Sequence, residues 1–383
     1  MILLRIFAFL AGFALINFTI ASAVRTFVLP RAAPDFLTKF VFRTSRRGFN
    51  LVVAPIESYA RRDSIMAFYA PIGLMTLTPI WLTLIAIGYT GIFWAINGGL
   101  LYDAWFKSAS SLLTLGFAAP NTFIESILVF LEAATGMIMV ALLIAYLPTI
   151  YSVFQRREAR VAAMAVRLGE PPSAITLLIR SHAIVHLENL HSLWVTFEEW
   201  FEDIEESHTS LSATAFFRSP DPNHSWITTA GCMMDAAALA RSTLDIPADP
   251  AADLMIRAGY LAMRSIAKLY GFPIPDDPRY PDQPISITRP EFDAAYDQLA
   301  ANNVPLKPDR AQCWQDFAGW RVNYDATLLD ICDLVMAPEA LWSGDRSQGR
   351  WALTPRFKTR NRLVSKEELY RERKEAELPN IKE

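Results

Sequence analysis

Residues 65–97 have the sequence IMAFYAPIGLMTLTPIWLTLIAIGYTGIFWAIN, which decides the class of fold because it is apolar and carries no charged side chain. A helix of about 20 apolar residues crosses the hydrocarbon core of a bilayer at about 1.5 Å per residue. We expect the crossing from about Pro71 to Trp94, with Pro71 and Pro79 near its start, where a missing amide hydrogen costs little. The chain is therefore predicted to be a membrane protein.

Two more apolar segments are candidate crossings. Residues 6–24 contain no charged side chain, and residues 122–151 lead into Arg156 and Arg157. For the first segment we favour a transmembrane helix. The alternative is a cleaved signal peptide, because Ala21–Ala23 reads ASA, which resembles a signal-peptidase site. With helices as the spanning elements, the sequence predicts an all-α membrane protein.

Charge around these segments predicts their orientation. Residues 25–64 hold eight basic side chains against three acids, and residues 155–167 read QRREARVAAMAVR. Residues 98–121 contain only Asp103 and Lys107 as charged groups. Because basic flanks are retained in the cytoplasm, we expect an outside N-terminus, a cytoplasmic loop over 25–64, an outward loop over 98–121 and a cytoplasmic C-terminal region.

The outward loop, GGLLYDAWFKSASSLLTLGFAAPNT (98–122), is too apolar for a solvated connection and too short to cross twice as helices. A helix over 101–113 that enters the membrane, followed by extended chain through Thr114–Ala118, fits this composition. Non-helical backbone at that depth is tolerated only where protein buries it or where it lines a water-filled path. The sequence therefore predicts a pore loop.

The order of outer helix, pore helix, Thr-x-Gly-Phe and glycine-bearing inner helix resembles the two-transmembrane pore module of the potassium-channel superfamily. The likeness covers about residues 66–155, within an expected pore module of 65–155. The segment YLPTIYSVFQRREARVAAMAVRLGEPPSA (146–174) is also similar to bacterial ion channels of the two-pore-domain-type potassium channel family.

The resemblance implies a selectivity filter and an inner-helix hinge. The filter positions are Thr114, Leu115, Gly116, Phe117 and Ala118, and the hinge is Gly136. In such filters backbone carbonyls and a threonine hydroxyl replace the hydration shell of the ion. One filter segment per chain implies a homotetramer that conducts monovalent cations, K⁺ above all, in a bacterial cell membrane. Membrane lipid and sibling chains are the implied partners, and no cofactor is implied beyond the permeating ion.

The filter departs from the family pattern at its outer end. Ala118 replaces the second glycine, Ala119 replaces the usual acid, and Leu113 replaces a preceding threonine. An alanine held at positive φ costs about 1 kcal/mol, so we expect an outer carbonyl ring that is reoriented or widened. The alternative function is a non-conducting membrane scaffold or sensor that retains a pore-like fold with a degenerate filter. A separate alternative is that TLGF (114–117) matches by chance in a loop of a membrane protein.

Two acids of the third apolar segment, Glu125 and Glu132, are seven residues apart and share a helical face. An ionisable group within a span faces a cavity, a partner or water. Glu132 is the candidate cavity acid of a tetramer. The alternative is a protonated carboxyl hydrogen-bonded behind the filter to Ser110 or Ser111, and Glu125 is expected at the outer boundary.

The remaining chain is expected to be soluble and mostly helical. Residues 156–270 form the predicted helical cytoplasmic domain, in which the inner helix continues until GEPPSA (169–174). Residues 271–383 form a proline-rich connector and a charged helical region that includes KEELYRERKEAEL (366–378). No sequence signature identifies a gating ligand.

Patterns for metal sites, catalysis and nucleic acid are weak or missing. His182 and His186 are four residues apart, and Glu205 lies three before His208, but neither pair has the further ligands that a metal site needs. We interpret the first pair as ordinary packing and the second as part of a solvated acidic face that can pair with the basic QRRE segment. The sequence lacks GxGxxG, phosphate-loop and GxSxG motifs, as well as a basic patch interleaved with aromatics, and it holds three scattered cysteines. The missing motifs and the missing basic patch predict neither an enzyme nor a nucleic-acid-binding protein. The scattered cysteines are predicted to be buried, reduced thiols.

Overall fold

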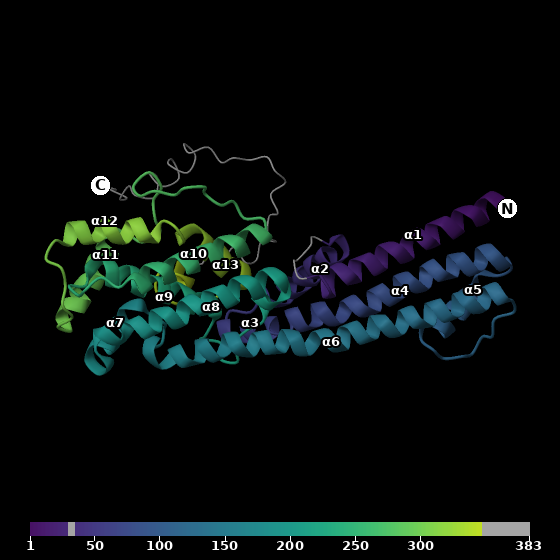
Figure 1. The fold of residues 1–383 in the computed structure, drawn as a ribbon, viewed down its shortest axis with the longest axis horizontal. Coiled ribbons are helices and arrows are strands. Elements are labelled where there is room, and N and C mark those ends of the chain that lie inside the picture. Colours follow the sequence, from purple (N-terminus) through teal and green to yellow (C-terminus); the bar gives the residue numbers. More distant parts are fainter. Residues whose placement is uncertain (30–34, 347–383) are drawn as a thin grey trace.

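The computed structural model describes residues 1–29 and 35–346, which form helices and no named strand. Across these ranges one isolated bridge joins Leu244 to Leu306. Figure 1 shows an elongated molecule, with a rod of long helices at one end and a cluster of shorter helices at the other. The all-α class is confirmed for the described residues, and the predicted charged helix at 366–378 lies outside them.

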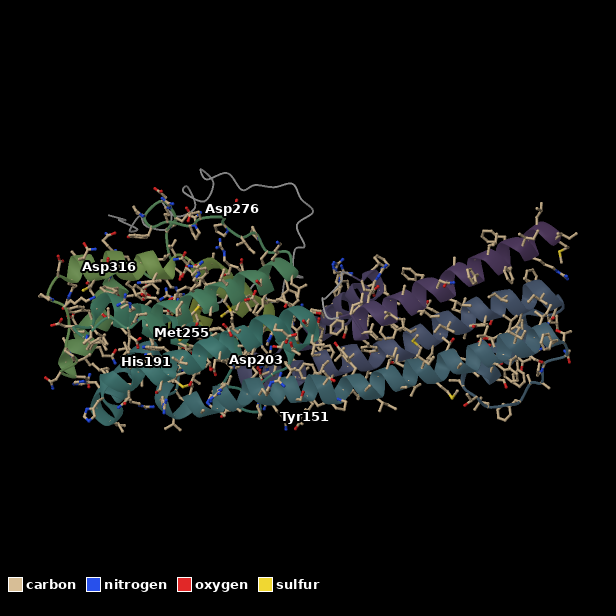
Figure 2. All side chains as sticks on the ribbon, viewed as in Figure 1. Tyr151, His191, Asp203, Met255, Asp276 and Asp316 are labelled. Atoms are coloured by element: carbon tan, nitrogen blue, oxygen red, sulfur yellow. The ribbon has the colours of Figure 1, made fainter. Side chains whose placement is uncertain are left out.

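The rod consists of α1 (Ile2–Phe27), α4 (Tyr69–Asn97) and α6 (Phe123–Leu168), each long and apolar enough to cross a membrane. The three predicted spans are thus confirmed as apolar helices with wider bounds. In Figure 2 nitrogen and oxygen atoms crowd the surface of the helical cluster and are sparse along the rod. Pro79 differs from expectation, because it lies inside α4 rather than near its start. Membrane helices tolerate such a proline where neighbours satisfy the freed backbone groups.

Glycines let α1 and α4 approach each other at backbone distance. A Cβ added to Gly12 would overlap the carbonyl oxygen of Gly88, and one added to Gly91 would lie 3.1 Å from the carbonyl oxygen of Ala8. Further along the pair, the indole Nε1 of Trp81 donates to Ser22 Oγ at 3.1 Å. Small residues at the contact and a polar bond across it are the means by which membrane helices associate.

The basic segment between the first two spans is mostly helical where the structure describes it. It forms α2 (Phe36–Val53) and α3 (Tyr59–Met66). Asp35 caps α2 by accepting the N–H of Thr38 at 2.8 Å, and the buried face of the helix combines Leu37, Val41 and Val53 with Arg46 and Asn50. The charge pattern predicts a connection between two spans and does not specify its secondary structure, which the two helices supply.

α5 (Leu101–Leu112) lies between α4 and α6 at the end of the rod farthest from the cluster (Figure 1). Residues 113–122 return from it without helix, and Thr122 begins α6 by accepting the N–H of Glu125 at 3.2 Å. α2, α3 and the cluster lie together at the other end of the rod. The helices of the basic segment and the helical cluster are therefore at the same end of the rod, as the charge pattern predicts.

α6 joins the rod to the cluster without interruption. Its 46 residues span about 69 Å at about 1.5 Å per residue. The helix ends at Leu168, and Gly169 follows at φ +79°, a backbone region that favours glycine. The predicted stop at GEPPSA is confirmed.

The cluster surrounds α9 (Trp226–Thr243), which is buried almost throughout. The helices around it are α7 (Ala174–Arg180), α8 (Leu190–Ser210), α10 (Pro250–Leu269), α11 (Arg289–Ala301), α12 (Arg310–Arg321) and α13 (Asp325–Val335). Arg321 is fully buried, with Asp235 at 2.5 Å and Asp325 at 2.8 Å. All three cysteines are buried and free, as predicted.

Residues 174–211, AITLLIRSHAIVHLENLHSLWVTFEEWFEDIEESHTSL, contain no proline or glycine and are expected to form one helix of the predicted helical domain, but the structure breaks it. A π-helical turn covers Ser181–Val185 and a 3-10 turn covers Leu187–Asn189, with His186 between them at φ +68°. Leu187 and Leu190 enter the core at this break, so burial of both leucines accompanies a change of chain direction. No proline or glycine marks the position, which is why the pattern alone missed it.

Candidate pore loop

Polar contacts hold α5 between the two long helices. Ser108 Oγ lies 3.0 Å from the carbonyl oxygen of Ala86 in α4 and 2.5 Å from Glu132 Oε1 in α6. Lys107 Nζ pairs with Glu125 Oε2 at 3.0 Å, and both side chains are nearly covered. Hydrogen bonds and ion pairs between apolar helices fix their relative position, so α5 is anchored to both neighbours.

The end of α5 places a threonine in an unusual backbone conformation. Leu115 N–H donates to the carbonyl of Ser110 at 2.8 Å, and Thr114 N–H donates to the carbonyl of Ser111 at 3.0 Å. This pair of bonds is a Schellman cap, whose left-handed residue is usually glycine. Here it is Thr114, at φ +56°, where a β-branched side chain costs about 1–2 kcal/mol.

From Thr114 to Phe117 the sign of the backbone angle φ alternates from residue to residue. Gly116 has φ +73°, whereas Leu115 and Phe117 are not among the residues of positive φ. Alternating hands turn successive N–H groups toward one side. At this side lies the buried Ser110 Oγ, which accepts Phe117 N–H at 2.8 Å and Ala118 N–H at 3.2 Å.

The carbonyl groups of the loop have no such partner. Among the described residues, no hydrogen bond reaches a carbonyl oxygen of residues 113–119. The side chains of Leu113, Leu115 and Phe117 are 53%, 50% and 69% exposed in the single chain. The N–H groups of Phe117 and Ala118 thus fix the loop to α5, whereas its carbonyl groups and apolar side chains are not covered by the single chain.

Ala118 does not adopt the positive φ that was expected to strain it. Its N–H instead bonds Ser110, and the left-handed residues of the loop are Thr114 and Gly116. The outer end of the segment therefore differs from an alternating filter, because an L-residue with a Cβ avoids the conformation that glycine accepts.

The remaining predicted site residues lie on α6. Glu132 is fully buried against α5, and its carboxyl contacts Ser108 rather than Ser110 or Ser111. A Cβ added to Gly136 would overlap the carbonyl oxygen of Leu112, the last residue of α5. Gly136 thus lies where the backbones of α6 and the end of α5 approach closely, and α6 is continuous through it.

Sequence reasoning did not assign Ser108 and Lys107 to this site. It offered Glu132 as a partner of Ser110, whereas the Ser110 hydroxyl accepts the N–H groups of Phe117 and Ala118. The available signal was the composition of KSASS (107–111), a polar run inside an apolar loop. Polar side chains in a membrane segment usually bond across helices, so each of them was a candidate contact.

The sequence predicts ordinary packing for the histidine pair and a solvated acidic face for Glu205 and His208, and the structure corrects the second prediction, because His208 is buried. His186 is exposed and lies outside any helix, and His208 is fully buried with Nδ1 3.0 Å from the carbonyl oxygen of Ile204. Glu205 instead accepts Ser265 Oγ at 2.6 Å. The expected pairing of the acidic face with the QRRE segment is confirmed within one chain by Arg156 and Asp203, at 3.3 Å.

No family model, no curated protein and no solved structure matches this chain.

Proposed function

We infer that the chain conducts monovalent cations passively, with K⁺ as the expected ion, through a pore shared by four copies. The filter is formed by Thr114, Leu115, Gly116, Phe117 and Ala118. The observation that carries this proposal is the row of loop carbonyls without hydrogen bonds, whose N–H groups are fixed to Ser110 on the opposite side. Carbonyls at membrane depth need partners, and dehydrated cations crossing a ring of loops are such partners.

The proposed oligomer is supported by the uncovered apolar surface around the loop. Phe130 is 70% exposed, Met137 59% and Ile144 65%, all on α6. Sibling helices and lipid acyl chains both suit such a surface. Because one chain supplies one loop, four copies close a ring, and the ring leaves the outer faces of α1 and α4 for lipid.

Gating is assigned to α6, because this helix reaches from the loop into the helical cluster. Arg157 of α6 is fully buried at the junction, where it donates to the carbonyls of Thr214 at 2.8 Å and Phe217 at 2.7 Å. A buried guanidinium with these partners couples displacement of α6 to displacement of the cluster.

Flux into liposomes tests the proposal. Purified full-length protein is reconstituted, and K⁺ and Na⁺ uptake are recorded for the wild type and for Gly116→Asp, with empty liposomes alongside. We expect cation uptake by the wild type and none by the variant, which places a charge at a position of φ +73° in the loop. Equal uptake by both proteins, or none by either, contradicts the proposal, provided that both proteins elute as folded oligomers.

The alternative is a non-conducting scaffold or sensor with the same fold, and the backbone at Ala118 favours it, because the outer end does not continue the alternation. The oligomer mass in detergent separates the two functions. A monomer or dimer cannot close a four-fold ring, so that result supports the scaffold.

A further inference from the structure

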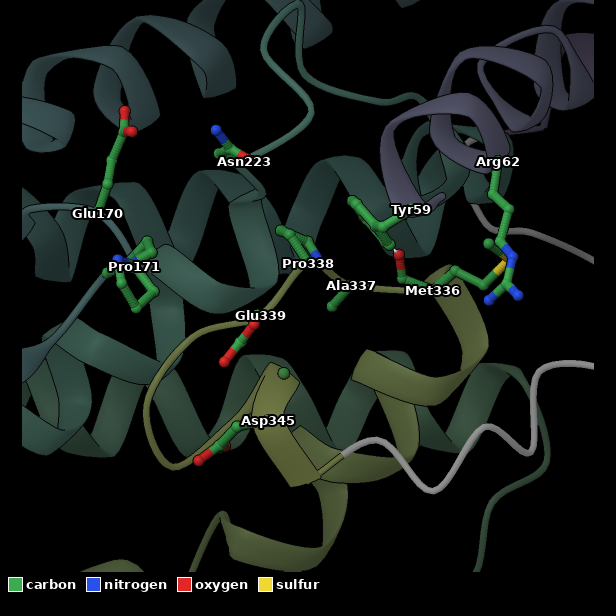
Figure 3. Close-up of a pocket in the computed structure, with 12 residues that line it drawn as sticks. Tyr59, Arg62, Glu170, Pro171, Asn223, Met336, Ala337, Pro338, Glu339 and Asp345 are labelled. Atoms are coloured by element: carbon green, nitrogen blue, oxygen red, sulfur yellow. Dashed lines mark hydrogen bonds between the residues drawn. The ribbon is translucent and has the colours of Figure 1, made fainter. Parts of the chain in front are cut away.

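Three side chains with metal-binding atoms converge beyond the end of α6. They are Glu170, directly after the end of α6, and Asp221 and His224 in the loop before α9, and their ligand atoms lie within 4.8 Å of one another. Glu170 and Asn223, the neighbour of His224, also line a cleft of about 650 Å³ between α3, the 170–172 turn and the segment 336–345 (Figure 3).

The imidazole of His224 has an unused ligand atom. Its Nε2 is shielded from solvent and makes no hydrogen bond among the described residues. The nearest carboxylate oxygen, Glu170 Oε1, is 3.8 Å away, too far for a hydrogen bond. Two ligands on one tetrahedral zinc ion, at bonds of about 2.1 Å, lie about 3.4 Å apart, so a shift of a few tenths of an ångström admits an ion between them.

The loop that carries two of the ligands is stiff. Pro220 and Pro222 flank Asp221, whose Oδ1 accepts Asn223 N–H at 2.9 Å. The backbone N–H of His224 donates to the carbonyl of Asp221 at 3.1 Å. These bonds fix the two ligand-bearing residues relative to each other before any ion binds, which reduces the entropy that binding must overcome.

We propose that Glu170, Asp221 and His224 bind a divalent transition-metal ion of the zinc class. One imidazole nitrogen with carboxylate oxygens is a ligand set that suits Zn²⁺, whereas Mg²⁺ prefers oxygen ligands alone. Water completes the coordination, because the ligands lie at the surface. The site is separate from the pore loop, so its existence does not depend on the proposed function.

The ion would connect the end of α6 to α3 and α13. Arg218, in the same loop, donates to the carbonyl of Val335 at 2.6 Å and pairs with Asp63 of α3. Metal binding thus links Glu170, at the end of α6, to α3 and α13 through one short loop. Occupancy of the site is expected to restrain movement of α6.

Zinc binding to the purified full-length chain in detergent tests the proposal by equilibrium dialysis. The expected result is one high-affinity Zn²⁺ per chain, with binding at least about 10-fold weaker in His224→Gln and in Glu170→Gln and with no comparable Mg²⁺ binding. Glu170→Gln changes an exposed side chain, so it remains a test if the histidine variant fails to fold.

His191→Gln is the matched control, because His191 is exposed and lies 3.1 Å from Asp249, a second pairing of histidine and carboxylate. It is expected to bind Zn²⁺ as the wild type does. The proposal is overturned if both site variants keep wild-type affinity, or if the control loses as much affinity as they do. Zn²⁺ binding without any ion flux in liposomes rejects the channel and leaves the metal site standing.

Discussion

Ser110 is the residue on which the shape of the loop depends most. Its hydroxyl oxygen accepts two consecutive N–H groups, those of Phe117 and Ala118, from a position that is 2% exposed. Ser110→Ala leaves both donors without a partner, which costs about 1–3 kcal/mol. We expect faster amide hydrogen exchange at these two residues by about 10-fold or more, and lower cation selectivity in liposomes.

Ser111→Ala is the control for this change. Ser111 is also buried in α5, but its hydroxyl bonds only the carbonyl of Lys107 within the same helix, at 2.9 Å. Loss of that bond is expected to leave exchange in the loop unchanged. If the two alanine variants exchange alike, the loop does not depend on Ser110.

Glu132 provides a second test among single residues. Its carboxyl contacts Ser108 between α5 and α6 rather than an open surface. Glu132→Gln keeps the size and hydrogen-bonding capacity of the side chain, so we expect single-channel conductance within about 20% of wild type, an effect too small for a lost cavity charge. A reduction of conductance by half or more at low salt, where screening is weakest, shows instead that the carboxylate faces the ions.

Replacing glycine by alanine is expected to change the stability of the protein in opposite directions at two positions, Gly12 in α1 and Gly48 in α2. Gly12→Ala places a methyl group on the Gly88 carbonyl and forces α1 away from α4, at a cost of about 1–3 kcal/mol. Gly48→Ala, inside α2, meets nothing within 4 Å and is expected to stabilise that helix by about 0.5–1 kcal/mol. Thermal unfolding in detergent checks both signs, and a stabilised Gly12 variant contradicts the packing.

The rod was predictable because its signal is local. An uncharged segment of sufficient length predicts a span, and Gly169 with the prolines after it predicts the end of α6. The helix α2 was predictable as well, from the spacing of Leu37 and Val41, although the charge of the segment predicts only orientation. Tertiary contacts decide the rest. The break at His186 accompanies burial of Leu187 and Leu190, which follow it, and no local residue type indicates it.

The site was predictable only in outline. The position of the loop and the conformation of Gly116 follow from the sequence, since glycine is the residue that accepts positive φ. The conformation of Thr114 does not follow, because a β-branched residue disfavours it and the helix cap imposes it. The partners of Ser108 and Ser110 depend on how the chain returns beside α5, which no spacing rule contains.

At the scale of the whole molecule, α6 connects the rod to the cluster through a buried pair of basic groups. Arg157 Nη1 lies 3.4 Å from His208 Nε2, and the ring of His208 packs against Trp226 with centroids 4.6 Å apart. Glu158 balances the charge of Arg157 at 2.8 Å. Burial lowers the pKa of His208 well below its usual value, and the charge of Arg157 lowers it further. The imidazole is therefore neutral in the folded protein at pH values where the unfolded chain protonates it.

This depressed pKa makes the junction sensitive to acid. Above about pH 6.5 the imidazole is neutral in both states, but below it the unfolded chain gains a proton that the folded chain refuses. Stability is then lost at about 1.4 kcal/mol per pH unit until the folded pKa is reached. We expect the melting temperature of the full-length protein to fall between pH 7 and pH 5, and to fall less in His208→Gln. His191→Gln removes an exposed histidine and is expected to retain the wild-type slope. If all three proteins have the same slope, the acid sensitivity of the protein arises elsewhere than at the contact between α6 and the cluster.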